Sequence, residues 1–314
     1  MNVINQANGN NFTAYNADCV DVVSFLPDDS IGISVFSPPF ASLYTYSDST
    51  HDMGNVKDDV EFFEQFDYLV KELYRVIKPG RIVAFHCMNL PTTKERDGYI
   101  GMKDFRGDLI RAFQKYGFIY HSEHCIWKDP LIAATRTKAI GLMHKQLCKD
   151  STVSRAGIPD YLVAMKKPGE NPEPVPHENG LTDFIGENPP KSGVLSHQIW
   201  RRYASPVWMD IDPSKTLQGA TARENDDERH ICPLQLQVID RALVLWSNPG
   251  DVVLSPFMGI GSEGYEALKM NRKFIGVELK TSYYGLAVRN LHDAEESMIE
   301  NDLFTNKESQ INDL

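Results

Sequence analysis

Short apolar runs alternate with longer amphipathic segments along most of this chain, and this alternation limits its fold more than any other feature. Residues 31–36 form an apolar, β-branched run followed by Ser37, Pro38 and Pro39, which predicts a buried strand. Residues 58–77 carry apolar side chains at the spacing of one helix face, and Pro79-Gly80 ends that pattern. Strands that alternate with helices favour an α/β fold, in which helices cover both faces of a mostly parallel sheet.

The same patterns recur on both sides of a less regular middle segment. We expect further strands at residues 81–87, 118–127, 161–165, 252–255 and 274–279. We expect further helices at residues 104–116, 233–246, 264–270 and 283–291. Gly117 and Pro233 agree with these helices, because glycine often follows a helix end and proline often begins a helix.

The strand and helix patterns fail between residues 168 and 223. Prolines and glycines are frequent there, which predicts a loop-rich insertion. Within it lies a cluster of aromatic and basic side chains: Trp200, Arg201, Arg202, Tyr203 and Trp208. This cluster either contacts nucleic acid or forms a small core of the insertion. The segment after residue 292 is acidic and poor in apolar residues, which predicts a frayed helix or disorder.

Length and composition indicate a globular protein. The chain has 314 residues, of which 42% are hydrophobic, enough for one large domain or a domain with a sizeable insertion. No apolar run reaches the length of a membrane span, and residues 1–11 lack the apolar stretch of a signal peptide. The five cysteines include no Cys-x-x-Cys pair. We therefore expect a reduced, cytoplasmic protein with no membrane partner.

The charge of the chain is unevenly distributed. The net charge is -11, yet seven basic residues between Arg136 and Lys167 face only two acids, Asp150 and Asp160. A local basic face can bind phosphates even when the whole protein is acidic. The basic loop at residues 131–158 is therefore predicted to contact nucleic acid, and the alternative is a solvated loop with scattered charge.

A glycine loop follows the strand predicted at residues 252–255. Gly259 and Gly261 lie in this loop, and a predicted helix follows. Glycine permits positive φ and a close approach of the backbone to a ligand. Glu278 ends the next strand, 17 residues after Gly261, a spacing that suits a carboxylate accepting hydrogen bonds from ribose hydroxyls. The loop predicts a nucleoside cofactor site, and the alternative is an ordinary turn between strand and helix.

The segment Ser37-Pro38-Pro39-Phe40 predicts a second site. The prolines fix φ and remove two N–H donors, so their carbonyl groups remain as rigid acceptors. Ser37 Oγ and the Pro38 carbonyl together suit the two N–H donors of an exocyclic amino group on a base. Accepting both would localise the nitrogen lone pair for attack on a methylsulfonium, while Phe40 stacks on the base. The alternative is a rigid turn at the end of a strand.

These motifs, in this order, resemble the permuted β-group of S-adenosylmethionine-dependent DNA amino-methyltransferases. In that group the catalytic motif precedes the target-recognition region and the cofactor loop comes last. Residues 12–128 and 228–291 carry the resemblance, including Asn16-Ala17-Asp18-Cys19 and Cys232-Pro233-Leu234. The middle of the chain matches nothing in the family pattern.

The resemblance implies a Rossmann-like class I methyltransferase sandwich with a mixed, mainly parallel sheet. It implies DNA methylation of the kind found in restriction–modification, with S-adenosylmethionine as methyl donor and base flipping out of double-stranded DNA. The implied catalytic residues are Ser37, Pro38, Pro39 and Phe40. The implied cofactor-binding residues are Asp18, Pro233, Ser255, Phe257, Gly259, Gly261, Ser262 and Glu278.

Two positions depart from the usual family pattern. The cofactor loop begins Ser255-Pro256-Phe257 where the family usually has Asp-Pro-Phe, which removes a carboxylate near the methionine end of the cofactor. The catalytic loop begins with Ser37 rather than Asp. In the family, Ser accompanies cytosine N4 more often, and Asp accompanies adenine N6. We therefore expect transfer to cytosine N4, with adenine N6 as the alternative.

Other activities are alternatives of a different kind. The chain could be a DNA-binding protein that holds the cofactor without turnover, or it could methylate RNA or a small molecule. Methylation of cytosine carbon-5 is not expected, because no Pro-Cys dipeptide supplies the nucleophile. A metal site is not expected either, because His121 and His124 fall on opposite faces of a predicted strand.

The motifs divide the chain into four parts. Residues 1–168 are the first catalytic part, with the catalytic loop 37–40 and the basic loop 131–158. Residues 169–225 are the target-recognition insertion, 226–291 the cofactor-binding part and 292–314 an acidic tail. The residues expected to bind DNA are Arg136, Lys138, Lys145, Lys149, Arg155, Arg201 and Arg202. The sequence leaves a monomer and a homodimer both open.

Overall fold

A nine-stranded sheet runs through the described residues of the computed structural model, which are 2–39, 59–137, 141–178, 180–181, 193–217 and 233–312. Its strands are β1 (Val3–Asn8), β2 (Phe12–Ala17), β3 (Ile31–Phe36), β4 (Ile77–Met88), β7 (Ile119–Ile126), β8 (Asp160–Lys166), β9 (Val207–Trp208), β10 (Val252–Ser255) and β11 (Lys273–Glu278). Their order across the sheet is β1-β2-β11-β10-β3-β4-β8-β7-β9. The short strands β5 (Leu90–Pro91) and β6 (Met102–Lys103) pair separately.

The sheet is mixed and mainly parallel, which confirms the predicted fold class. Strands β2, β11, β10, β3 and β4 run parallel to one another. Strand β1 pairs antiparallel with β2, and β8 pairs antiparallel with both β4 and β7. Parallel neighbours leave their carboxyl ends at one edge of the sheet, which is where open α/β sheets bind ligands.

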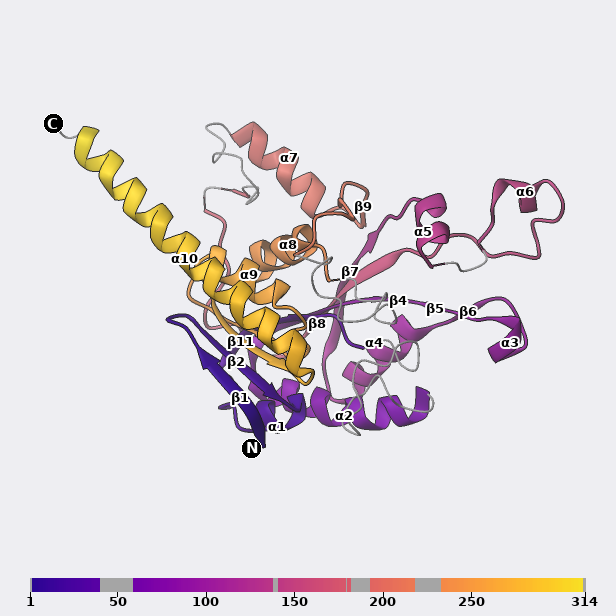
Figure 1. Cartoon of the computed structure of the whole chain (residues 1–314), viewed down its shortest axis with the longest axis horizontal. Helices are drawn as coiled ribbons and strands as arrows, with labels where there is room; N and C mark the ends of the chain where they lie inside the picture. The colour runs from indigo at the N-terminus through magenta and orange to yellow at the C-terminus, as the bar shows by residue number, and fades with distance from the viewer. Residues whose placement is uncertain are drawn as a thin grey trace.

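Helices cover both faces of the sheet (Figure 1). The longer ones are α2 (Asp59–Val76), α4 (Phe105–Lys115), α5 (Pro130–Thr137), α7 (Gly193–Tyr203), α8 (Leu236–Trp246), α9 (Ser262–Lys269) and α10 (Thr281–Asn312). The shorter ones are α1 (Cys19–Ser24), α3 (Lys94–Asp97) and α6 (His144–Leu147). Helices α1, α2 and α4 pack on one face, and α8, α9 and α10 pack on the other. None of the described helices is both long and apolar enough to cross a bilayer.

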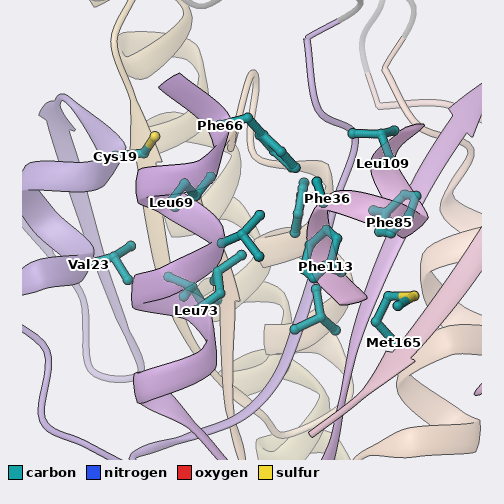
Figure 2. Close-up of a cluster of buried hydrophobic side chains, with 14 of the residues drawn as sticks. Cys19, Val23, Phe36, Phe66, Leu69, Leu73, Phe85, Leu109, Phe113 and Met165 are labelled. Atoms are coloured by element: carbon teal, nitrogen blue, oxygen red, sulfur yellow. The ribbon is translucent and has the colours of Figure 1, made fainter. Parts of the chain in front are cut away.

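Two hydrophobic cores result from the alternation of side chains along the central strands. In β4, Val83 and Phe85 join the core beneath α1, α2 and α4, while Ile82 and Ala84 join the core beneath α8, α9 and α10. Figure 2 shows the first core, where Phe85 stacks on Phe113 of α4 with ring centroids 5.2 Å apart. A strand buried on both faces has no polar alternation, as in parallel sheets generally.

Most of the predicted elements are confirmed, and several boundaries are wrong. The strands at 31–36 and 252–255 agree residue for residue. Pro79-Gly80 does not separate helix from strand, because β4 begins directly after α2 and contains both residues. Gly80 has a φ of 73° and donates its N–H to the Lys167 carbonyl at 3.0 Å. Glycine tolerates this positive φ, so the irregular start of β4 still makes a backbone hydrogen bond.

One helix begins later than predicted, and the tail takes the helical form of its two predicted alternatives. Helix α8 begins at Leu236 rather than at Pro233, with Gln235 as its N-cap residue. The tail after residue 292 continues α10 as a helix to Asn312. Its start is anchored, because the Glu295 carboxylate accepts the N–H groups of Asn10 and Asn11 at 3.1 and 2.6 Å.

Several elements of the structure were not predicted from the sequence. Strands β1 and β2 and helix α1 precede the first predicted strand. The described part of the middle segment contains α7 and β9, and β9 extends the main sheet by pairing parallel with β7. Residues Trp208 and Tyr203 are buried there, so part of the aromatic cluster is core.

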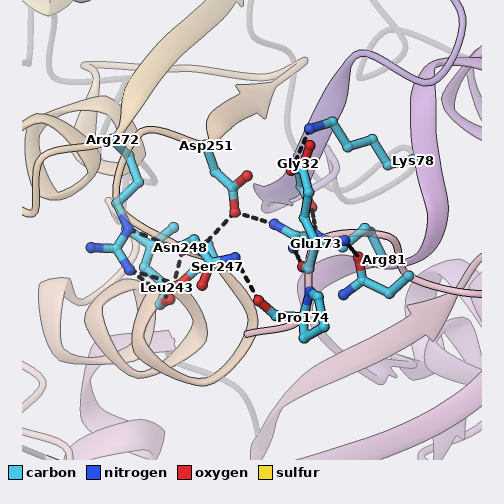
Figure 3. A network of polar contacts seen from close by, with 11 residues as sticks. Gly32, Lys78, Arg81, Glu173, Pro174, Leu243, Ser247, Asn248, Asp251 and Arg272 are labelled. Carbon is cyan, nitrogen blue, oxygen red and sulfur yellow. Dashed lines mark hydrogen bonds and ion pairs between the residues drawn. The ribbon is translucent and has the colours of Figure 1, made fainter. Parts of the chain in front are cut away.

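A buried ion pair joins the amino ends of the central strands (Figure 3). Arg81 in β4 pairs with Asp251, which directly precedes β10, and both side chains are buried. Arg81 also donates Nε to the Gly32 carbonyl at 2.9 Å and Nη1 to the Glu173 carbonyl at 2.8 Å. Asp251 accepts the N–H of Asn248 at 2.7 Å. All of these groups are therefore partnered away from water.

Arg81→Ala is expected to lower the free energy of unfolding by about 3–5 kcal/mol, because it leaves the Asp251 carboxylate buried without its cation. Urea unfolding of both proteins measures this change. The control is Arg111→Ala, which removes a cation paired with Asp108 at the surface and is expected to cost less than about 1 kcal/mol. Equal losses in the two variants would contradict the importance of the buried pair.

Candidate functional site

The two predicted motifs meet at the carboxyl edge of the parallel strands. Strands β3 and β10 are direct neighbours, with Ser34 opposite Leu254, and β10 and β11 are neighbours, with Ser255 opposite Gly276. Ser37 follows β3, the glycine loop follows β10, and Glu278 ends β11. The sheet thus brings together segments that are more than 200 residues apart in sequence, as in the hydrogen bond from Ser34 Oγ to the Leu254 carbonyl.

The glycine loop adopts the backbone that its sequence predicts. Gly259 has a φ of 55° and Gly261 a φ of 89°, values in the left-handed region that favours glycine. A Cβ on Gly261 would lie 3.3 Å from Ala287 of α10, so the loop also packs closely there. Ser262 is buried and begins α9. Phe257 contacts Phe36 at the end of β3, with ring centroids 5.7 Å apart.

Glu278 holds the glycine loop directly. Its Oε2 accepts the N–H of Gly259 at 2.8 Å, and its Oε1 accepts the N–H of Lys280 at 2.8 Å. A carboxylate oxygen has room for more than one hydrogen bond, so Glu278 can orient the loop and still accept from a ligand hydroxyl. Asp18 lies at the same end of the site, since both carboxylates raise the pKa of the buried Cys19 thiol, after the larger effect of burial.

Two observations indicate that this edge accepts a ligand. Ser255 Oγ is fully buried and has no hydrogen-bond partner, although it lies where β10 ends. A Cβ built on Gly259 would meet no atom within 4 Å, so there is open space over the loop. A buried polar atom without a partner is uncommon and needs an explanation. A polar ligand group bound at this edge would supply one.

Asp18 and Pro233 have structural positions that the sequence did not reveal. Asp18 is the N-cap of α1, and its carboxylate accepts the N–H of Val20 at 2.7 Å. Pro233 lies before α8 rather than at its first turn. Of the catalytic segment, Ser37 and Pro39 are half-buried and Pro38 is buried, while Phe40 lies outside the described residues.

Ser37 contacts a line of polar side chains that sequence reasoning missed. Its Oγ lies 3.1 Å from Nδ1 of His86 in β4. His86 Nε2 lies 3.1 Å from Oδ2 of Asp160, the first residue of β8. Lys128, which follows β7, lies 2.5 Å from the same oxygen. No local motif links these residues, and only the pairing of β4 with β8 brings His86 and Asp160 together.

The residues expected to bind DNA are only partly assembled. Lys145, Lys149 and Arg201 are exposed. Arg155 is half-buried, and burial lowers the pKa of its guanidinium. Arg202 lies 3.5 Å from Asp210, so its charge already has an acidic neighbour.

Two of the expected DNA contacts cannot be placed fully. Arg136 belongs to α5, but its side chain lies outside the description, and Lys138 lies outside the described residues altogether. Trp200 is exposed on α7 next to Arg201. The exposed residues of α5 to α7 therefore remain a predicted surface for DNA.

Three buried carboxyl groups lie in helices α8 and α9. Burial, with a smaller effect of Glu278, raises the pKa of Glu263 in α9 to about 8. Burial raises the pKa of Glu266 to about 7, and that of Asp240 in α8 to about 6. The hydroxyl of Tyr203 lies 3.2 Å from Asp240 and opposes the effect of burial there.

Metal ligands are not grouped in the described part of the chain. It holds no cluster of three or more His, Cys, Asp or Glu side chains with suitable geometry. His124 is buried and stacks on Trp208 at a centroid distance of 4.3 Å, while His121 is exposed.

Comparison with known proteins identifies a family and a fold. A family model described as DNA methylase (N6_N4_Mtase) matches residues 31–289. Among curated proteins, the chain is 23% identical to the type II methyltransferase M.BglII of Bacillus subtilis over 284 residues, which cover 88% of this chain and 68% of that protein.

Solved structures share the fold at low sequence identity. A Thermus thermophilus protein described as a DNA modification methylase, in complex with S-adenosyl-L-methionine, superposes with a TM-score of 0.63 and 20% identity, covering 88% of this chain and 92% of that one. PvuII DNA methyltransferase, described as cytosine-N4-specific, superposes with a TM-score of 0.60 and 15% identity, covering 95% and 97%. The expected Rossmann-like methyltransferase sandwich is confirmed by these likenesses.

The stability of the Glu263→Gln variant, relative to that of the parent, is expected to increase as the pH rises from about 5 to 7.5. The folded pKa of Glu263 is about 8, above its ordinary value, so unfolding releases a proton in this range and stability falls as pH rises. The parent is expected to lose up to about 1.4 kcal/mol of unfolding free energy per pH unit from this group, and the neutral amide of the variant does not have this loss. Urea unfolding at the two pH values measures the difference.

The matched control is Glu296→Gln, which changes an exposed carboxylate on α10. It is expected to show no pH-dependent difference from the parent. An equal difference between the Glu263 variant and the parent at both pH values would show that this carboxyl is ionised in the folded protein.

Proposed function

Because the chain belongs to the DNA methylase family of the N6/N4 type, we propose that it is a site-specific DNA methyltransferase that modifies an exocyclic amino group. The observation that carries the proposal is the meeting of Ser37-Pro38-Pro39 with the glycine loop held by Glu278, on neighbouring parallel strands. One segment suits the amino group of a base, and the other suits a nucleoside cofactor. Their proximity is what methyl transfer between the two requires.

The cofactor of the proposed reaction is S-adenosyl-L-methionine, whose methylsulfonium supplies the methyl group. The residues of this edge fit it. Glu278 would accept the ribose hydroxyls while it holds Gly259, and charge-assisted bonds of this kind are among the stronger ones. The backbone at Gly259 and Gly261 would approach the cofactor closely, and Ser255 Oγ would gain a polar partner. The remaining residues of the proposed set are Asp18, Pro233, Phe257 and Ser262.

Ser37 and Pro38 would hold the target amino group. Ser37 Oγ and the Pro38 carbonyl accept its two N–H donors, which localises the lone pair on nitrogen for in-line attack. Pro39 fixes the backbone direction, and Phe40 would stack on the extruded base. Fixed acceptors that need no rearrangement during the reaction lower the barrier more than flexible ones do.

Cytosine N4 is the proposed target, with adenine N6 as the alternative. The support for cytosine is Ser37 at the first position of the catalytic segment, and the matching family model covers both chemistries. We further propose residues 169–225 as the target-recognition region, with the basic loop 131–158 along the DNA backbone. The parts 1–168 and 226–291 together form the catalytic domain.

Incubation with unmodified bacterial DNA and radiolabelled S-adenosyl-L-methionine, followed by digestion to nucleosides, tests the proposal. N4-methylcytosine is the expected product. N6-methyladenine would establish the alternative, and no labelled nucleoside with diverse DNA substrates would overturn the proposed function.

Ser37→Ala is the diagnostic variant in this assay. Loss of one positioned acceptor is expected to lower turnover about 100-fold. Cofactor affinity, measured by calorimetry, is expected to change little, because Ser37 lies on the side of the base. Turnover near that of the parent would remove Ser37 from the mechanism.

Neutralising Lys138, Lys145 and Lys149 together by substitution with Gln is expected to reduce the salt dependence of DNA binding. The log-log slope of affinity against salt should become shallower by about 2–3, at about 0.9 per lost phosphate contact. Affinity should fall about equally for all DNA sequences, because phosphate contacts position the protein without reading bases. Fluorescence anisotropy over a salt series measures the slope.

A charge-matched control replaces three cations distant from the basic loop, namely Lys71 of α2, Lys115 of α4 and Lys273 of β11. It is expected to leave the slope unchanged. If both triple variants behave alike, the basic loop is solvated and does not follow the DNA backbone.

A further inference from the structure

Four polar side chains form a continuous line that leads away from the catalytic hydroxyl. The line begins at Ser37 Oγ, passes through His86 Nδ1 and Nε2 to Asp160 Oδ2, and ends at Lys128 Nζ. His86 is 8% exposed and Asp160 is 3% exposed, so the middle of the line is sealed from water. Polar groups that are buried at this depth are costly unless they act on one another.

The charge of Asp160 favours one of the two tautomers of a neutral His86. Burial raises the pKa of the Asp160 carboxyl, but His86 and Lys128 together outweigh burial and lower it below its ordinary value. Asp160 is therefore a carboxylate at neutral pH. When the imidazole of His86 is neutral, a proton on Nε2 faces the Asp160 carboxylate, and the lone pair of Nδ1 then faces Ser37.

This tautomer has a direct consequence for Ser37. A hydroxyl has one proton and two lone pairs. If the Ser37 proton is donated to His86 Nδ1, both lone pairs of Oγ face away from the histidine and are available as acceptors. An unaligned serine hydroxyl would spend part of its time donating toward the amino group, and this would oppose the proposed reaction.

We infer that His86 and Asp160 are positioning residues that act through Ser37, orienting its hydroxyl as an acceptor and taking up the proton that methyl transfer releases. The inference rests on the proposed function. Asp160 Oδ1 has no hydrogen-bond partner, and the 3.1 Å contact of His86 Nε2 with Oδ2 is not aligned as a hydrogen bond. The pair therefore has hydrogen-bonding capacity left over in the free protein.

The step balances in atoms and electrons. The amino nitrogen attacks the methyl carbon, a C–N bond forms, and the S–C bond breaks with its electron pair left on sulfur. The cationic nitrogen then gives one proton to Ser37 Oγ, as the hydroxyl proton of Ser37 passes to His86 Nδ1. The products are the methylated base, S-adenosylhomocysteine and the imidazolium of His86 beside the Asp160 carboxylate. The imidazolium later returns its proton to water.

The charged surroundings of His86 within the described residues are few. Asp160 of β8 and Lys128 after β7 form the line itself. Arg106 of α4 and Glu123 of β7 lie on neighbouring elements and pair with each other at 2.6 Å, so their charges largely cancel. Protonation of His86 in the free protein would block Nδ1 as an acceptor. The rate of methyl transfer should therefore fall at low pH.

Single-turnover methylation at saturating cofactor and DNA, measured between about pH 5.5 and 9, tests the inference. His86→Ala is expected to lower the rate about 100-fold, the lower end of what positioned proton acceptors contribute. His86→Asn keeps a polar group near the Nδ1 position but cannot titrate. Its rate is expected to be low and to lack the fall at acidic pH that is expected for the parent. Asp160→Asn is expected to lower the rate as well, because it no longer fixes the tautomer.

Cofactor affinity by calorimetry is expected to stay within about twofold in all three variants, which separates their effect from misfolding. The matched control is His124→Asn. His124 lies in β7 and is buried to a similar degree, and its ring stacks on Trp208 and lies 2.9 Å from the Ser205 carbonyl rather than near Ser37. It should retain the parental rate and pH profile per cofactor-binding molecule.

His86 variants with a parental rate, or with the acidic fall intact, would overturn the inference. A parent that methylates no DNA would instead overturn the proposed function.

Discussion

The buried ion pair of Arg81 and Asp251 fixes the relative positions of the strands that carry the two segments of the site, Ser37-Pro38-Pro39 and the glycine loop (Figure 3). It joins residues 170 positions apart at the amino ends of β4 and β10, and Arg81 also binds the Gly32 carbonyl at the start of β3. The register places Leu254 opposite Ser34 and Ser34 opposite Val83, so the three parallel strands present their carboxyl ends at the same edge. A charge removed from water is tolerated only with its partner, so the three strands are held in this arrangement or the pair is lost.

Much of the fold follows from periodicity, because the pattern of burial is local. The strands at 31–36 and 252–255 and the helices that follow them could be predicted from apolar spacing alone. Strand β2 was not predicted: its sequence Phe-Thr-Ala-Tyr-Asn-Ala is short and only weakly apolar, although its burial alternates along the strand and it pairs with β11. The sequence left the tail open between a frayed helix and disorder, and the hydrogen bonds of the Glu295 carboxylate to the distant turn at Asn10 and Asn11 could not be read from its local pattern.

The candidate site divides in the same way. The glycine loop and Ser37 could be proposed from the sequence because their signals are local, such as the glycines that permit the positive φ found at Gly259 and Gly261. His86 and Asp160 could not, because each looks like an ordinary strand residue in isolation. Their contact exists only through the antiparallel register in which Met88 lies opposite Asp160 and His86 lies opposite Leu162. The register between strands far apart in sequence is a property of the whole sheet, and a local sequence pattern does not encode it.

The geometry around Ser37 also bears on which base is modified. Cytosine N4 and adenine N6 both present two N–H donors on one nitrogen, so a hydroxyl and a carbonyl can hold either of them. The line through His86 and Asp160 acts only on the Ser37 proton and is equally indifferent to the ring behind the nitrogen. In the proposed reaction the catalytic segment would hold the amino group, and side chains that contact the ring would add to the choice of base. The support for cytosine N4 is therefore the family's association of Ser at this position with that base, rather than the geometry of the hydroxyl. A single family model that spans both amino-methylations is what such a division of tasks would produce.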